Sequence, residues 1–182
     1  MSKIKEFAVP TIVLFIICFV AAALLGVTNK VTAPKIEEIN KKNQQEAMQA
    51  VMADAVSFDD EQTADDENSA TYAAAYDADG NVIGYAITAT GEVGYGDVVK
   101  MMVGIDTEGK VTTVKNLENS ETASLGGKIL KEGTDFLKRF MGTDDAMAVD
   151  AVSGATRTSN ATKTAVNNAI ECYKNIAEGG TK

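Results

Sequence analysis

The sequence predicts an α+β domain, an antiparallel sheet with flanking helices, preceded by one N-terminal transmembrane helix. Three observations lead to this prediction. An uncharged apolar stretch comes first, strand-like runs separated by acidic glycine turns occupy the middle, and an amphipathic helix lies near the C-terminus. Consecutive strands followed by helices are typical of α+β folds, in which the sheet is mostly antiparallel.

Composition narrows the possible functions. None of the 182 residues is histidine, which removes histidine as general base, metal ligand or haem ligand. The two cysteines, Cys18 and Cys172, form no CxxC or iron–sulfur spacing. The net charge is −9 without clustered Lys and Arg, so nucleic acid is not expected as a partner. We predict no metal site and no independently catalytic residue, and any electron transfer would need an organic cofactor.

The N-terminal region predicts a membrane anchor. Residues 1–6 form a short tail, and Phe7–Val27 contains twenty-one residues without charge. At about 1.5 Å per residue, a helix of this length spans a hydrocarbon core of about 30 Å. We therefore assign residues 7–28 to a transmembrane anchor, with a cleaved signal peptide as the alternative. Lysines on both flanks leave the orientation undecided by charge alone.

A stalk and an acidic loop are predicted between the anchor and the domain. Pro34 is expected to open a helix, and 29–57 reads as a helical stalk, with a partner-binding helix as the alternative. Residues 58–70 contain six acidic side chains and are typical of a solvated loop. The domain itself is then expected to occupy residues 71–182.

The first half of this domain predicts two successive β-hairpins. Acidic turns containing glycine, Asp77–Asn81 and Asp106–Lys110, each separate two strand-like runs. The three glycines in Gly91–Gly96 are expected to break the sheet between the hairpins. The predicted strands are 72–76, 82–89, 98–105 and 111–117.

The second half predicts helices around one further strand. Lys128–Phe140 has helical apolar spacing that Gly133 can divide, and Met147–Val152 is strand-like. A last helix is expected over Asn160–Glu178, with Ser159 as its N-cap.

The turn before this last helix is the candidate functional site. Residues 153–159 contain four hydroxyl side chains, one glycine and one arginine. A helix N-terminus can hold a phosphate, because its first N–H groups lack partners and its dipole favours an anion. The alternative is that these hydroxyls only cap the helix. Two further glycine-bearing loops, 91–96 and 121–127, favour a ligand that the backbone approaches closely.

The pattern Asp150-x-x-Ser153-Gly154-Ala155-Thr156-x-Thr158-Ser159 resembles the flavinylation motif of FMN-binding domains. These domains occur in the G subunit of the Rnf electron-transport complex and in the related NqrC subunit. Glu121 to Gly126 is similar to the second family motif, although Ala123-Ser124 stands where the family has Pro-Gly. Gly94-Tyr95-Gly96 is similar to a third motif.

The resemblance implies that Thr156 is esterified to the phosphate of FMN and that Leu125 contacts the flavin ring. The cofactor-binding residues it implies are Thr156, Ser153, Gly154, Ala155, Thr158, Ser159, Glu121, Thr122, Leu125, Gly126, Gly94 and Tyr95.

The same resemblance implies electron relay in an Rnf-type ferredoxin:NAD⁺ oxidoreductase coupled to Na⁺ or H⁺ translocation. It implies membrane and iron–sulfur subunits as partners and a separate flavin transferase that uses FAD and Mg²⁺. It places the N-terminus in the cytoplasm and the FMN domain on the extracytoplasmic face of the cell membrane. The alternatives are an NqrC-like or stand-alone FMN-binding respiratory subunit, and a non-redox membrane-anchored binding or assembly module.

Overall fold

The computed structural model describes residues 2–64, 69–94, 97–119, 121 and 126–179. The chain divides into two compact units, Met1–Asn43 and Gln44–Lys182. The first unit is entirely helical in its described part, and the second contains the sheet and the remaining helices.

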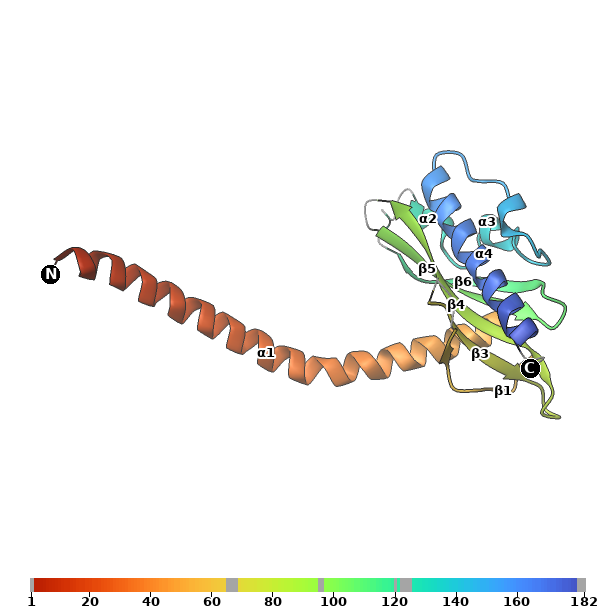
Figure 1. Cartoon of the computed structure of the whole chain (residues 1–182), viewed down its shortest axis with the longest axis horizontal. Coiled ribbons are helices and arrows are strands. Elements are labelled where there is room, and N and C mark those ends of the chain that lie inside the picture. Colours follow the sequence, from red (N-terminus) through yellow and green to blue (C-terminus); the bar gives the residue numbers. More distant parts are fainter. Residues whose placement is uncertain (1, 65–68, 95–96, 120, 122–125, 180–182) are drawn as a thin grey trace. The chain divides into compact units, whose positions relative to one another are not determined.

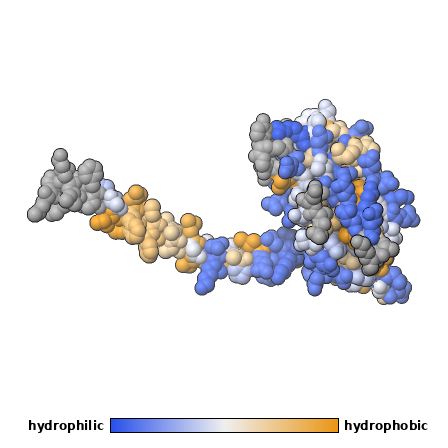
Figure 2. Space-filling model, in the orientation of Figure 1, coloured by the Kyte–Doolittle hydropathy of each residue, from blue (hydrophilic) through white to orange (hydrophobic). Residues whose placement is uncertain are grey.

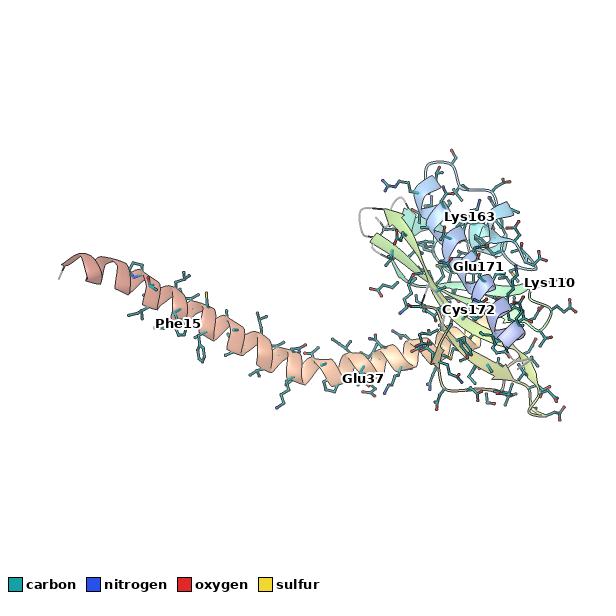
Figure 3. All side chains as sticks on the ribbon, in the orientation of Figure 1. Phe15, Glu37, Lys110, Lys163, Glu171 and Cys172 are labelled. Carbon is teal, nitrogen blue, oxygen red and sulfur yellow. The ribbon has the colours of Figure 1, made fainter. Side chains whose placement is uncertain are left out.

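Helix α1, Ser2–Val51, begins in the first unit and ends in the second. It is long and apolar enough to cross a membrane, by length and composition. Its apolar side chains are exposed, as Figure 3 shows for Phe15. Figure 2 shows that they gather along one part of the helix. Pro34, expected to open a new helix, lies inside α1 instead. A proline inside a helix removes one backbone hydrogen bond and crowds the preceding turn, and the helix continues beyond it through good helix formers such as Lys35, Glu37 and Glu38.

The sheet is antiparallel throughout and has the order β1-β3-β4-β5-β6, with β2 also pairing to β3. Both predicted hairpins are confirmed, as β3–β4 and β5–β6. Their turns are closed by Asp77 and Asp106, whose carboxylates accept backbone N–H groups two and four residues later. The strands are β1 Ser57–Phe58, β2 Gln62–Thr63, β3 Thr71–Tyr76, β4 Val82–Gly94, β5 Asp97–Asp106 and β6 Val111–Asn119.

The predicted break at Gly91–Gly96 is wrong for its first residues, because β4 continues to Gly94 and Gly91 pairs with Val99 of β5. Gly91 instead allows the last helix to pack closely on β4. A Cβ at this position would clash with the carbonyl oxygen of Ala161 in the last helix. The glycine therefore allows the helix backbone to lie directly on the strand. The acidic segment also differs from the predicted loop, since it contributes the short strands β1 and β2.

Each face of the sheet has its own apolar core. The long C-terminal helix α4, Thr156–Gly179, covers one face through residues such as Ala165, Val166 and Ile170 (Figure 1). The last turns of α1 and the residue after it pack on the other face, where Ala47, Met48, Val51 and Met52 are buried. Thr112 on β6 donates a hydrogen bond to the carbonyl of Val51 over 2.7 Å. The second unit, Gln44–Lys182, therefore needs the end of the predicted stalk for its core.

Short helices connect the sheet to α4. The helix expected over 128–140 is two helices, α2 Gly126–Ile129 and α3 Asp135–Lys138, and Gly133 between them has φ of +74°. The strand expected over 147–152 is wrong: the segment begins with the 3-10 helix η1, Ala146–Ala148. Asp145 caps η1 through the N–H of Met147, and the buried residues Ala146 and Val149 are three apart, a helical rather than a strand period.

Candidate functional site at the start of helix α4

Helix α4 begins earlier than the sequence predicted. Its first helical residue is Thr156, and the N–H of Ser159 donates to the carbonyl of Ala155 over 2.9 Å. The prediction of Ser159 as N-cap is therefore wrong, since Ser159 lies within the first turn. The preceding chain turns at Gly154, where φ is +80°, and the N–H of Ala155 donates to the carbonyl of Val152. Gly154 has the left-handed conformation that glycine adopts without strain.

Burial separates the four hydroxyl residues of this segment into two pairs. Ser153 and Thr156 are exposed, whereas Thr158 is 3% exposed and Ser159 is fully buried. The Ser159 hydroxyl donates to the carbonyl of Ala155 over 2.9 Å and accepts the N–H of Val152 over 3.0 Å. Thr156 and Ser153 therefore present their side chains to a ligand or an enzyme arriving from solvent, and Ser159 is directed inward.

The structure brings parts of two predicted motifs together at Thr158. A Cβ built on Gly126 would clash with Thr158 Oγ1 and with a carboxylate oxygen of Glu121. Gly126 thus allows α2 to lie against the first turn of α4. Glu121 is held by its own N–H, which donates to Asn119 Oδ1 over 3.2 Å. Glu121 and Gly126 consequently lie beside Thr158 in the first turn of α4.

An open cavity of about 440 Å³ adjoins the turn before Thr156. Its walls combine apolar side chains with two cations, Lys128 and Arg139, and one acidic residue, Asp135. Arg139 also donates a hydrogen bond to the carbonyl of Asp150 over 3.2 Å, which ties α3 to the segment leading into the turn. The lining residues are Lys128, Ile129, Thr134, Asp135, Phe136, Arg139, Val152, Ser153, Gly154 and Ala155.

Most of the cavity lining lies outside the site that the sequence predicts. Only Ser153, Gly154 and Ala155 belong to that site, whereas Lys128, Ile129 and the α3 residues belong to the amphipathic helix predicted over 128–140. Their spacing indicated a buried face, and Phe136 is indeed buried. No local pattern distinguishes an apolar residue that faces a core from one that lines a cavity.

Other predicted residues cannot be placed in the site. Thr122, Leu125 and Tyr95 lie outside the described residues, so their contacts with a flavin stay predictions. Gly94 is the last residue of β4 and pairs with Asp97 of β5. Among the described residues no group of three or more Cys, Asp or Glu side chains is placed to hold a metal ion.

Comparisons with known proteins match both units of the chain. Residues 94–171 match the FMN-binding domain family, and residues 1–51 match the RnfG N-terminal region. The G subunit of an ion-translocating oxidoreductase complex from Methanosarcina acetivorans is 30% identical, over 98% of this chain and 100% of its own length. The G subunit of the Na⁺-translocating ferredoxin:NAD⁺ oxidoreductase complex of Acetobacterium woodii is 29% identical, over 92% of this chain and 91% of its own.

A comparison with solved structures gives a match as well. The crystal structure of Shewanella oneidensis NqrC superposes with a TM-score of 0.49 and 16% sequence identity, covering 71% of this chain and 74% of that one.

Proposed function

The chain belongs to the family of G subunits of ion-translocating oxidoreductase complexes, and from this premise we propose that it relays electrons through FMN bound covalently to Thr156. The observation that supports this attachment site is the exposed Thr156 side chain at the first residue of α4, inside the region that matches the FMN-binding domain family. Ser153 is the other exposed hydroxyl residue of the segment, but it precedes the turn at Gly154.

The position of Thr156 suits a phosphoester. A phosphodiester keeps one negative charge, and the first N–H groups of a helix lack intrahelical acceptors. The dipole of the 24-residue helix α4 adds a favourable potential at the same end. The exposed Gly154 has no side chain, so a phosphate at Thr156 meets little steric hindrance from the turn.

Attachment is a group transfer that this chain serves as acceptor. In the proposed step, Thr156 Oγ1 attacks the FMN-side phosphorus of FAD, held by a Mg²⁺-dependent flavin transferase. The Oγ1–P bond forms as the phosphoanhydride bond breaks, AMP leaves, and the hydroxyl proton passes to a base or water. No electron is transferred in this step. The transferase has to reach Thr156, which its exposure allows.

The residues of the adjoining cavity fit the ring of such a cofactor. FMN, when bound, supplies reversible transfer of one or two electrons. Ile129, Phe136 and Val152 provide an apolar surface that excludes water from one part of the cavity. Lys128 and Arg139 place two positive charges beside it against the one negative charge of Asp135, and a net positive charge would favour the more negative, reduced form of a flavin.

The membrane anchor explains why a covalent cofactor is useful. An apolar helix such as α1 would hold the domain at a bilayer, and a tethered flavin could not diffuse from it. We propose a single-pass protein with a cytoplasmic N-terminus and the FMN domain on the extracytoplasmic face. Its partners would be the membrane and iron–sulfur subunits of a complex that translocates Na⁺ or H⁺.

The attachment site is tested by co-expressing the full-length chain with a flavin transferase. We expect flavin fluorescence that stays with the polypeptide in a denaturing gel, and a mass increase of one FMN less one water. Thr156→Val should abolish both signals, and Thr156→Ser should retain them because it keeps the hydroxyl. Ser153→Ala is the matched control and should be labelled like the wild type.

Three results would contradict the proposal in different ways. A colourless wild-type protein would favour the non-redox module. Flavin that washes out on denaturation would refute only the covalent bond. Loss of labelling in Ser153→Ala, with labelling retained in Thr156→Val, would move the attachment to Ser153.

A further inference from the structure

The fully buried hydroxyl of Ser159 connects the two ends of the turn that presents Thr156. It accepts the N–H of Val152, before the turn, and donates to the carbonyl of Ala155, immediately before the helix. A serine has a single O–H donor, and this one is already engaged. Ser159 therefore cannot donate to a phosphate without giving up the bond to Ala155, and its burial keeps it from solvent.

Removing this bridge would affect the turn specifically. The Val152 N–H would lose its acceptor, and an amide left without an acceptor in a partly buried turn is unfavourable. The bond from the Ala155 N–H to the Val152 carbonyl would remain, without the second connection that Ser159 supplies. More conformations of Gly154 would become accessible, so the Thr156 hydroxyl would spend less time in any one orientation.

A comparable hydroxyl one turn further along α4 provides the reference. Thr162 is also fully buried and also donates to a carbonyl four residues earlier, that of Thr158, over 2.8 Å. Both residues thus make the same kind of helical hydrogen bond. They differ in that Ser159 also accepts from Val152, whereas the bond that Thr162 donates stays within the helix.

We propose that Ser159 is a positioning residue for flavin attachment: it holds the turn so that Thr156 Oγ1 lies ready for transfer, without touching the cofactor. This inference rests on the proposed attachment at Thr156. The step it assists is the transfer described above, in which the Oγ1–P bond forms as AMP leaves FAD. Holding a nucleophile in one orientation raises the rate of such a step.

The test uses the full-length chain, purified without flavin in detergent, with FAD, Mg²⁺ and a purified flavin transferase. The labelling rate is followed by in-gel fluorescence for the wild type, Ser159→Ala, Ser159→Cys and Thr162→Val. We expect at least a tenfold lower rate for Ser159→Ala, an intermediate rate for Ser159→Cys because a thiol is a weak hydrogen-bonding group, and a near wild-type rate for Thr162→Val.

Hydrogen exchange of the same unlabelled proteins tests the bridge directly. The peptide containing Val152 should exchange at least tenfold faster in Ser159→Ala than in the wild type or Thr162→Val, while peptides from β5 stay unchanged. This readout does not depend on the flavin or the transferase. It also shows whether a slowly labelled variant has lost only the structure of the turn or its whole fold. If Ser159→Ala does not fold, the labelling rate of Ser159→Cys tests the positioning role.

The outcomes separate this inference from the proposed function. Labelled wild type with Ser159→Ala labelled equally fast would overturn the positioning role and leave attachment at Thr156 intact. Unchanged exchange at Val152 in Ser159→Ala would overturn the bridge itself. Wild-type protein that takes up no flavin would refute the attachment and this role with it.

Discussion

Gly126 shows how a single residue joins two segments of the site. Its Cα lies so close to Thr158 Oγ1 and the Glu121 carboxylate that a side chain there would displace one of them. Its own backbone φ is not in the left-handed region, since the positive-φ glycines among the described residues do not include it. The glycine is therefore required for space, and not for backbone conformation.

Gly126→Ala is expected to lower the free energy of unfolding by about 1–3 kcal/mol, because added volume in a packed site forces its neighbours to move. The flavin labelling rate should fall as well, since Thr158 lies in the turn of α4 that begins with Thr156. Chemical unfolding and labelling measure the two effects. Gly26→Ala is the control, because a methyl at Gly26 meets no atom within 4 Å. Equal stability of both variants would contradict the close approach.

At the scale of elements, α4 is anchored at both ends. Its first turn carries the candidate site, and near its last turns Tyr173 donates a hydrogen bond to the carbonyl of Thr107 over 2.9 Å, in the turn after β5. The Tyr173 ring packs edge-on against Tyr85 with ring centroids 5.8 Å apart. Partial burial, followed by the neighbouring Tyr85 and Asp106, raises the pKa of the Tyr173 hydroxyl above its ordinary value.

Tyr173→Phe should therefore destabilise the domain by about 1 kcal/mol near neutral pH, the typical value of one hydrogen bond. Because the folded pKa is raised, the stabilisation is fully present below the unfolded pKa of about 10 and is lost as the pH rises through the folded value. Urea unfolding of both proteins between pH 8 and 11 measures this difference. A stability difference between the two proteins that stays constant up to pH 11 would contradict the expected loss of this stabilisation when Tyr173 ionises.

At the scale of the whole molecule, the boundary of the compact unit can be tested by truncation. The sequence placed the domain at 71–182 after a stalk ending at residue 57, whereas the compact unit begins at Gln44. Residues 44–182 keep Ala47, Met48, Val51 and Met52, which are buried on the second face of the sheet. Residues 58–182 lack all four.

We expect residues 44–182 to unfold cooperatively without detergent, and residues 58–182 to be less stable by several kcal/mol. Burial of each Val or Met side chain contributes about 1.5–3 kcal/mol. Thermal and urea unfolding of the two fragments give the comparison. Equal stability would instead agree with the predicted assignment of residues 29–57 to a stalk and show that the end of α1 is dispensable for the core.

Features that a few neighbouring residues encode could be predicted from the amino-acid sequence. An uncharged run long enough for a bilayer predicts the apolar part of α1, and the acidic glycine turns predict the hairpins β3–β4 and β5–β6. The motif around Thr156 identified the candidate hydroxyl and the family, because its residue types and spacing are local properties.

Features that depend on how distant segments meet became visible only in the folded chain. Strand β4 continues through Gly91, on which α4 lies, and α4 begins at Thr156 with Ser159 turned inward to Val152. The cavity wall is assembled from α2, α3 and the turn before α4. These features depend on contacts between residues far apart in the chain. The pattern of apolar and polar residues along one segment shows which face is buried, but it does not specify which distant segment packs against that face.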